Sequence, residues 1–314
     1  TRSVNVCLDF VILKNRLGGS VELYQSHTYD LLLEKSIPIT NGFASYFENI
    51  GETENKGIEV SLLGVIVDKG GFSWSVRPQF TINRNEIVAL TGQLDEEGNP
   101  VDDIDNRWFI GEPLEVVYDY EIAGVWQTGE EEAASSYGQI PGRIKIKDLN
   151  DDGEITSLED RKILGSMQPD YFGTLSTTIS YKGLDLSVSL YTVQGVTQYN
   201  DIRADFNARG NMYKVDYWTP DNPSNSAPRP EKDFGLGAYS TAFNVGDASY
   251  VALQNISLSY SIPAKLLPTK YIDGVKIYIT GRNLKYWTDW IGYSPESGYY
   301  PTVKSWIFGL NIDL

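Results

Sequence analysis

The sequence predicts an all-β fold in which antiparallel strands form the wall of a transmembrane β-barrel. Three observations support this prediction. Apolar and polar residues alternate with a period of two in many segments, the connections between these segments alternate between short and long, and helical patterns are few and short. Counting the segments predicts about ten strands.

The alternation is clearest in residues 72–83, where Trp74 and Phe80 hold apolar positions and Ser75 and Gln79 hold polar ones. A strand with this pattern has two faces in different environments. The pattern recurs, in places more weakly, at 4–12, 19–28, 57–66, 174–182, 184–190, 256–262, 275–283 and 305–314. We therefore expect these segments to pair in one sheet.

Connection lengths separate two all-β architectures, because a soluble β-sandwich also alternates apolar and polar residues. The short connections are 13–18, 67–71, 182–184 and 263–273, and the long ones are 30–56, 86–170, 195–247 and 287–300. Strict alternation of this kind is typical of outer-membrane barrels, which have short periplasmic turns and long external loops. A soluble all-β protein is the alternative.

Composition excludes several classes of protein. The 314 residues include 42 Asp plus Glu and 26 Lys plus Arg, which gives a net charge of -16 and no basic face for a nucleic acid. One histidine, His27, and one cysteine, Cys7, leave little material for a zinc site, a histidine-based triad or disulfides. No segment approaches the roughly 18 apolar residues of a membrane helix. Because the chain starts at Thr1 rather than at a methionine, we expect it to be processed, truncated or a piece of a longer protein.

Residues 148–159, DLNDDGEITSLE, have the spacing of a twelve-residue calcium loop, with Gly153 at the sixth position. The candidate ligands are Asp148, Asn150, Asp152, Glu154, Thr156 and Glu159. Because Ca²⁺ prefers six to eight oxygen ligands, we expect a structural Ca²⁺ in this external segment. The preceding GRIKIK is strand-like, so the loop is not part of a helix–loop–helix hand. The alternative is an Asx-rich turn without a metal.

Five longer motifs occur together in this chain. They are NGFASYFENIGETENKGIEV (41–60), YGQIPGRIKIKDLNDDGEITSLEDRKILGSMQPDYFGTLSTTISYKGLDLSVSL (137–190), YWTPDNPSNSAPRP (217–230), SYVALQNISLSYSIP (249–263) and IYITGRNLKYWTDWIGYSPESG (277–298), and the ending FGLNIDL (308–314) completes the set. With these motifs the chain resembles the SusC/RagA class of TonB-dependent outer-membrane transporters. The motifs follow the order of that family over most of the chain, so we expect residues 1–314 to be the C-terminal part of its barrel, with 86–170 as a long external loop.

The resemblance implies a nutrient importer of a Gram-negative outer membrane and not an enzyme. Family barrels are similar to the roughly 22-stranded, plugged type, so about ten strands would be less than half of the wall. The implied partners are a SusD-like surface lipoprotein, the TonB–ExbB–ExbD complex acting through the missing N-terminal part, and a glycan or peptide cargo. The family pattern also allows a dimer of transporter–lipoprotein pairs. Its calcium loop often has Asp directly before Arg, which makes Asp160 an alternative to Glu159 as the last ligand.

Five tryptophans lie in or beside the long connections, where flat rings can stack on sugar faces. These candidate cargo-binding residues are Trp108, Trp126, Trp218, Trp287 and Trp290. The structural alternative for each is packing within the loops or against a partner lid. Trp74 and Trp306 instead lie on apolar strand faces, where lipid contact is expected.

Two other functions are weighed against import. The first is a secreted, calcium-binding all-β adhesion or scaffolding module, which would be soluble without detergent. The second is a β-rich glycoside hydrolase with a dockerin-like loop, using acids from 96–105 or 130–132. That chemistry needs two carboxyls held about 5–9 Å apart on a rigid scaffold, whereas acidic runs in loops are usually solvated surface.

Overall fold

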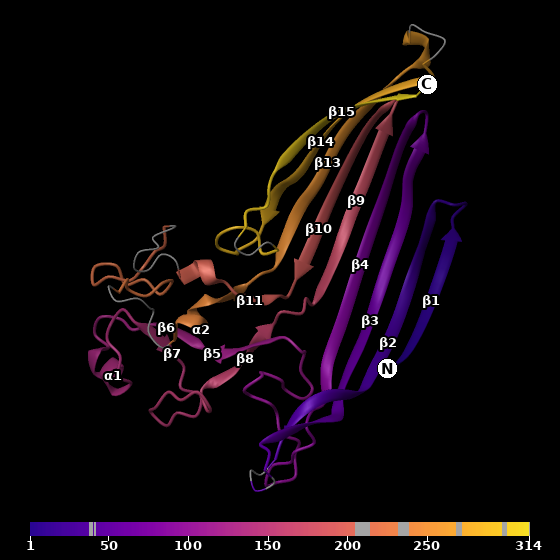
Figure 1. Ribbon diagram of the computed structural model, residues 1–314. Helices are drawn as coiled ribbons and strands as arrows, with labels where there is room; N and C mark the ends of the chain where they lie inside the picture. The colour runs from indigo at the N-terminus through magenta and orange to yellow at the C-terminus, as the bar shows by residue number, and fades with distance from the viewer. Residues whose placement is uncertain are drawn as a thin grey trace.

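The computed structural model describes residues 1–37, 40, 42–204, 214–231, 239–267, 272–296 and 300–313. Its main feature is a nine-stranded sheet with the order β1-β2-β3-β4-β9-β10-β13-β14-β15. The strands are β1 (Arg2–Ile12), β2 (Leu17–Ser36), β3 (Ser45–Lys69), β4 (Phe72–Ala89), β9 (Tyr171–Tyr181), β10 (Leu184–Gln194), β13 (Tyr250–Ile262), β14 (Gly274–Trp287) and β15 (Ser305–Asp313). All neighbours are antiparallel, and the sheet forms a tall, curved wall (Figure 1).

All nine alternating segments of the sequence are strands of this sheet, which confirms the predicted all-β wall. The predicted count of about ten agrees with the structure to within one, since the described residues supply nine strands to the sheet. Within these residues β1 and β15 are the two edges, so the sheet is an open part of a barrel wall.

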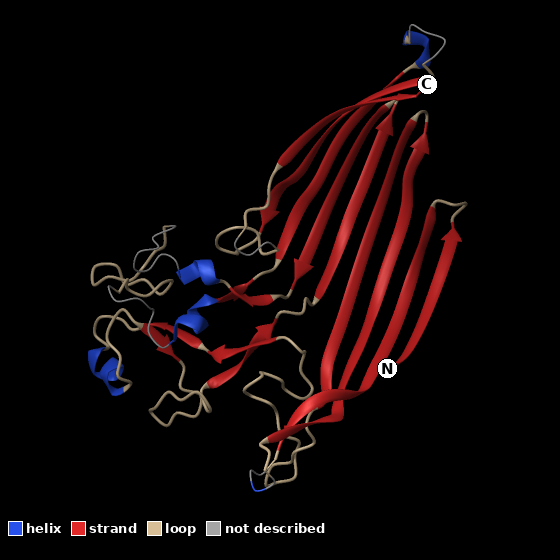
Figure 2. Cartoon of the chain, viewed as in Figure 1, coloured by secondary structure: helices blue, strands red, loops and turns tan. Residues whose placement is uncertain are grey.

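The other elements are short and gather at the end of the wall away from the C-terminus (Figures 1 and 2). Three small sheets pair β5 (Val116–Tyr120) with β8 (Arg161–Ser166), β6 (Ile122–Val125) with β7 (Ile144–Ile146), and β11 (Thr197–Tyr199) with β12 (Val245–Asp247). The helical pieces here are α1 (Glu131–Ser136), α2 (Ser240–Asn244) and the 3₁₀ turn η2 (Asp201–Ala204), while a second 3₁₀ turn, η4 (Ala264–Leu266), follows β13 at the opposite end. No described helix has the length and apolar character needed to cross a membrane.

The register of the wall places apolar residues on one face and polar residues on the other. Leu258 of β13 pairs with Ile279 of β14, and Ile279 pairs with Phe308 of β15, which is 75% exposed. On the other face hydroxyls bond across strands, as between Thr178 and Ser187 at 3.1 Å. Such a large exposed apolar face would be costly in water and suits lipid, so the polar face is the one that lines the lumen.

The connection predicted at 30–56 is wrong. Strands β2 and β3 stay paired as far as Ser36 and Ser45, so only residues 37–44 connect them. Irregular pairing between Thr28 and Leu32 shifts the register, and Asp30 has a φ of 58°. A bulge breaks the period-two pattern without ending the strand, which hid the extension. The other seven connections have the predicted short or long character.

Most of the buried core lies in the long connections, and the buried apolar residues Ile87, Tyr250 and Ala252 of the wall lie at the strand ends next to them. Residues 90–170 and 195–249, here called the external layer, contain a cluster of Tyr120, Ile144, Ile146, Ala227, Ala242 and Phe243 and a smaller one of Phe109, Val116 and Tyr118. All five residues of β5 are buried. The external layer is therefore a folded body with its own hydrophobic core.

Aromatic rings cover glycines within the wall. A Cβ on Gly57 would lie 2.4 Å from Tyr24 Cζ and 2.6 Å from the Ile82 carbonyl oxygen, while the Tyr24 hydroxyl donates to Asn83 Oδ1 at 2.8 Å. Gly64, on the same strand, has its nearest such neighbour at 3.6 Å. The glycine at position 57 thus makes room for a ring that bridges β2 and β4.

We predict that Gly57→Ala destabilises the full-length protein by about 1–3 kcal/mol, because the new methyl group displaces the Tyr24 ring. The matched control Gly64→Ala should be neutral or slightly stabilising. The measurement is the temperature at which the folded, fast-migrating barrel band is lost on a gel. Equal melting temperatures for the two variants would contradict the role of the ring.

Candidate functional site

The predicted calcium loop directly follows β7 in the external layer. Asp148 Oδ2 accepts hydrogen bonds from the Gly153 amide at 2.9 Å and the Tyr137 hydroxyl at 3.0 Å. Desolvation alone would raise the pKa of Asp148, but these hydrogen bonds outweigh it and hold the pKa below its usual value. The other oxygen, Oδ1, is buried without a hydrogen-bond partner. One carboxylate oxygen at the first ligand position is thus left for another group.

Asp160 holds the loop from behind. Its side chain is fully buried, and its two oxygens accept hydrogen bonds from the amides of Leu149 at 2.9 Å and Thr156 at 2.7 Å. Glu159 is exposed, and its amide donates to Thr156 Oγ1 at 3.2 Å. Asp160 is thus the residue that joins the two ends of the loop, while the exposed Glu159 carboxylate accepts a hydrogen bond from Thr156 Oγ1 at 3.5 Å.

The remaining candidate ligands bond to one another across the turn. Asn150 Nδ2 donates to Asp152 Oδ2 at 3.0 Å, and the Glu154 amide donates to Asp152 Oδ1 at 2.8 Å. Among the described residues, no three His, Cys, Asp or Glu side chains are close enough together to hold a metal ion. The donor set of oxygens and the unpartnered Asp148 Oδ1 nevertheless fit a hard cation, provided that Asp152 turns away from its present partners.

Two of the five candidate tryptophans are structural. Trp126 and Trp218 are each only 5% exposed. The Trp218 indole donates to Gln127 Oε1 at 3.0 Å, and the Lys145 ammonium lies 4.2 Å from the centroid of the Trp126 ring. Both rings are therefore used inside the external layer and have no free face for a cargo.

The other three candidates are more accessible. Trp287, at the end of β14, is 50% exposed, while Trp108 and Trp290 are partly buried. None of the ring pairs found among the described residues joins two of the five tryptophans. The structure thus does not assemble them into one stacking surface. Trp287 pairs with Val251 and directly follows Tyr286 on the strand, so its exposed ring lies on the apolar, lipid-facing side of the wall and not toward the lumen.

A group of tyrosines on the lumen face was missed by the sequence analysis. Tyr191, Tyr250 and Tyr286 come from β10, β13 and β14, with ring centroids 6.0 Å and 5.8 Å apart. Glu296, from the β14–β15 connection, accepts a hydrogen bond from the Tyr250 hydroxyl at 2.5 Å and one from the Tyr286 hydroxyl at 2.8 Å. This tyrosine–glutamate cluster ties the last external loop to the wall. The sequence could have pointed to these tyrosines, because they stand at polar positions of their strands. It contains no comparable sign of Glu296.

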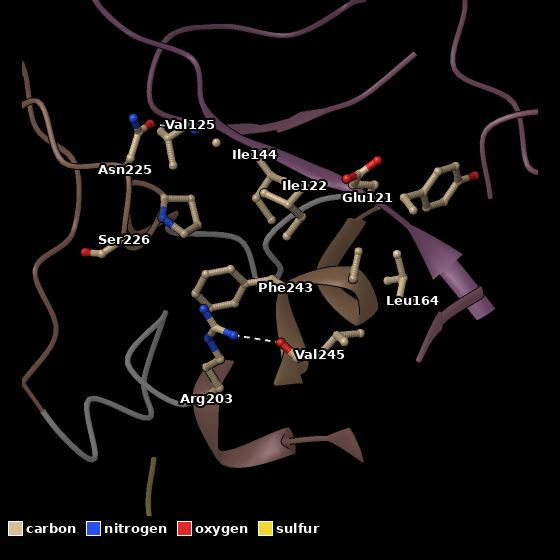
Figure 3. A pocket seen from close by; sticks show the side chains of 14 residues that line it. Glu121, Ile122, Val125, Ile144, Leu164, Arg203, Asn225, Ser226, Phe243 and Val245 are labelled. Atoms are coloured by element: carbon tan, nitrogen blue, oxygen red, sulfur yellow. Dashed lines mark hydrogen bonds between the residues drawn. The ribbon is translucent and has the colours of Figure 1, made fainter. Parts of the chain in front are cut away.

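The external layer also contains a pocket of about 320 Å³ (Figure 3). Ile122, Val125, Ile144, Leu164 and Phe243 make its lining mainly apolar. Its charged groups already have protein partners. Glu121 forms salt bridges with Lys147 at 3.2 Å and Lys162 at 2.7 Å, and Arg203 donates to the Val245 carbonyl at 2.7 Å. The pocket therefore offers apolar contact and no arrangement of acid and base suited to hydrolysis.

We predict that Trp218→Ala destabilises the external layer by about 3–5 kcal/mol, because it empties a buried site and removes an indole hydrogen bond. Trp287→Ala, which removes an exposed ring, should change stability by about 0.5 kcal/mol or less. Limited proteolysis of the full-length protein measures the effect as the rate of cleavage within 90–170 and 195–249. Equal cleavage rates for the two variants would show that Trp218 does not hold the layer together.

Comparisons with known proteins agree on the kind of chain to which this one is similar. A family model described as TonB dependent receptor-like, beta-barrel matches residues 1–284. TonB-dependent receptor P26 of Formosa agariphila is 32% identical over 340 residues, covering 99% of this chain and 34% of that receptor. TonB-dependent receptor SusC of Bacteroides thetaiotaomicron is 28% identical over 328 residues, covering 99% of this chain and 32% of SusC.

A solved structure shows the same architecture. The RagAB peptide importer in its open-open state superposes with a TM-score of 0.78 at 25% identity, covering 99% of this chain and 34% of that chain. The chain thus spans about a third of the length of the relatives that it matches.

Proposed function

Because the chain belongs to the TonB-dependent receptor-like β-barrel family, we propose that it forms the C-terminal wall and external layer of an active nutrient importer in a Gram-negative outer membrane. The observation that carries the proposal is the wall itself, with an apolar outer face, a polar inner face, short turns at one end and a folded layer at the other. Family members are transporters or receptors, so both the adhesion-module and the hydrolase alternatives lose their support.

The external layer would receive a cargo together with a SusD-like lipoprotein. RagAB, the solved relative, is described as a peptide importer, and SusC is a second relative of the same class. We propose oligosaccharides or similarly large nutrients as the cargo, with a peptide as the alternative that the RagAB likeness supports. The tyrosine–glutamate cluster on the lumen face is the candidate contact, and the buried Trp126 and Trp218 support the layer from within.

Energy for import would come from the TonB–ExbB–ExbD complex, acting on parts of the protein outside this chain. The described residues form a continuous hydrogen-bonded wall with no large opening element, which suits a fixed frame around a moving plug. A dimer of transporter–lipoprotein pairs is compatible with this assembly.

We predict that deletion of the gene abolishes uptake of the cargo by native cells, and that the full-length gene restores it. A protonophore should block the restored uptake, because TonB action depends on the proton gradient. The measurement is accumulation of labelled oligosaccharide and peptide pools. Restored uptake that persists after the gradient is collapsed would contradict TonB-dependent import and indicate passive diffusion.

We further propose that Asp148, Asn150, Asp152, Thr156, Glu159 and the Glu154 carbonyl hold a structural Ca²⁺, with Asp160 supporting the loop. A bound cation would neutralise carboxylates that otherwise repel one another, and would fix the turn between β7 and β8. The support comes from the ligand spacing and from the buried, unpartnered Asp148 Oδ1.

We predict that Ca²⁺ raises the melting temperature of the full-length protein, that a chelator reverses the effect and that Mg²⁺ at the same concentration does not reproduce it. Asp148→Asn combined with Glu159→Gln should abolish the Ca²⁺-dependent part, because both changes remove a charged ligand. Asp151→Asn is the matched control, since Asp151 is exposed at a φ of 59° that asparagine also tolerates. A melting temperature that does not respond to Ca²⁺ in the unmodified protein would rule out the site.

A further inference from the structure

The short turns at one end of the wall carry a set of free cations. The described residues of these turns include Lys14, Arg16, Lys69, Lys182 and Lys265. All five are exposed, and none of them forms a salt bridge within the described part of the chain. The acids of the same turns are Asp68 and Asp273. A basic rim is unexpected in a chain whose net charge is -16.

Several lysines elsewhere in the protein are paired with acids, although Lys214, Lys285 and Lys304 are exposed and form no salt bridge within the described residues. Lys56, Lys145 and Lys162, for example, each form a salt bridge with a glutamate at 2.7–3.5 Å. On the lumen face near the rim, Lys276 pairs with Asp185 at 3.1 Å. The rim cations thus differ from the paired lysines in keeping their charge available to a partner outside the chain.

Three of the turns lie next to one another. The β3–β4 turn adjoins the β9–β10 turn, because Phe72 pairs with Tyr181 and the Lys182 amide donates to the Gly71 carbonyl at 3.4 Å. The β9–β10 turn in turn contacts the end of β13, where the Ser261 amide donates to the Gly183 carbonyl at 2.8 Å. Lys69, Lys182 and Lys265 therefore stand on neighbouring turns at the end of the wall where the C-terminus lies (Figure 1).

Directly beside these turns, the lipid-facing side of the wall is aromatic and grooved. The rings of Phe72 and Tyr181 lie 6.5 Å apart, and the Lys182 ammonium lies 5.1 Å from the Tyr181 centroid. A groove of about 420 Å³ begins at Leu184, two residues beyond Lys182, and is lined by apolar side chains. They are Leu184, Leu258, Tyr260, Ile277, Ile279 and Phe308, and Ser259, Tyr278 and Gly309 complete the lining. A cation above an aromatic ring and an apolar groove is suited to a molecule with an anionic head and a hydrocarbon tail.

We propose that this rim binds anionic phospholipids of the periplasmic leaflet, with headgroup phosphates along Lys69, Lys182 and Lys265 and an acyl chain in the groove. The inference rests on the proposed outer-membrane orientation, in which short turns face the periplasm. Basic side chains close to a membrane surface are attracted to anionic lipid, and each one strengthens binding about fivefold. The lipid would anchor the short-turn end of the wall while the acidic external part remains free of such contact.

The test compares fluorescent phosphatidylglycerol with fluorescent phosphatidylcholine of equal chain length, titrated against the full-length transporter in neutral detergent and followed by anisotropy. We expect the unmodified protein to prefer phosphatidylglycerol, and Lys69→Gln, Lys182→Gln and Lys265→Gln together to weaken its binding on the order of 100-fold. High salt should weaken the preference in the same direction, because it screens exposed charges.

The matched control replaces three exposed lysines of the external side, Lys214, Lys285 and Lys304, with glutamine, which changes the net charge equally. It should leave the lipid preference intact. Equal affinity for the two lipids, or an equal loss in both triple variants, would overturn the proposal. Competition by glycerol phosphate as strong as that by the intact lipid would also overturn it, because the groove would then contribute nothing. Cargo uptake, measured separately as above, reports on import whatever the lipid result.

Discussion

Each strand of the wall must satisfy two different surroundings at once, and the rest of the structure depends on this constraint. Backbone amides and carbonyls cannot remain unpaired in hydrocarbon, so neighbouring strands must be hydrogen-bonded along their length. Side chains then alternate between lipid and lumen with no freedom to shift by one residue. Leu258, Ile279 and Phe308 form one continuous row because the register of three strands agrees. A single slip would bring their polar neighbours into lipid.

A wall built in this way has no interior of its own, which explains where the core is found. The sheet is one layer thick, and its apolar side chains face outward. The connections that leave the external end of the wall therefore supply the buried clusters, around Tyr120 and Phe243 and around Phe109 and Tyr118. Long connections are tolerated here because they pack against one another as a second folded body. Their length, which would be unusual in a soluble domain, follows from this role.

The sequence was sufficient to locate the wall because the same alternation that lipid and lumen require is visible in the residues. It failed where local pairing departs from that period, as at Asp30, where a shift in register concealed the long extension of β2 and β3. It also could not separate buried from exposed tryptophans. Trp126 and Trp218 are buried by residues distant in the chain. Gln127, for example, accepts the hydrogen bond of the Trp218 indole. Sites in loops depend on such tertiary contacts, and these contacts produce no periodic pattern of residues in the sequence.

The external layer and the last connection are attached to the wall by side-chain contacts at a few residues, and this attachment bears on the proposed function. Arg84, near the end of β4, donates to the carbonyls of Pro169 at 3.0 Å and Asp170 at 2.9 Å and forms a salt bridge with Asp170 at 3.2 Å. The Asp170 amide donates to the Gln194 carbonyl at 2.8 Å, so one short segment joins β4, β9 and β10 where the layer begins. Glu296 joins the last loop to β13 and β14 in a similar way. The layer is thus tied to the sheet at Asp170, and the separate β14–β15 connection is tied to it at Glu296. In the proposed importer, selectivity for a cargo would depend on the exposed side chains of these connections, while the buried residues beneath hold their shape.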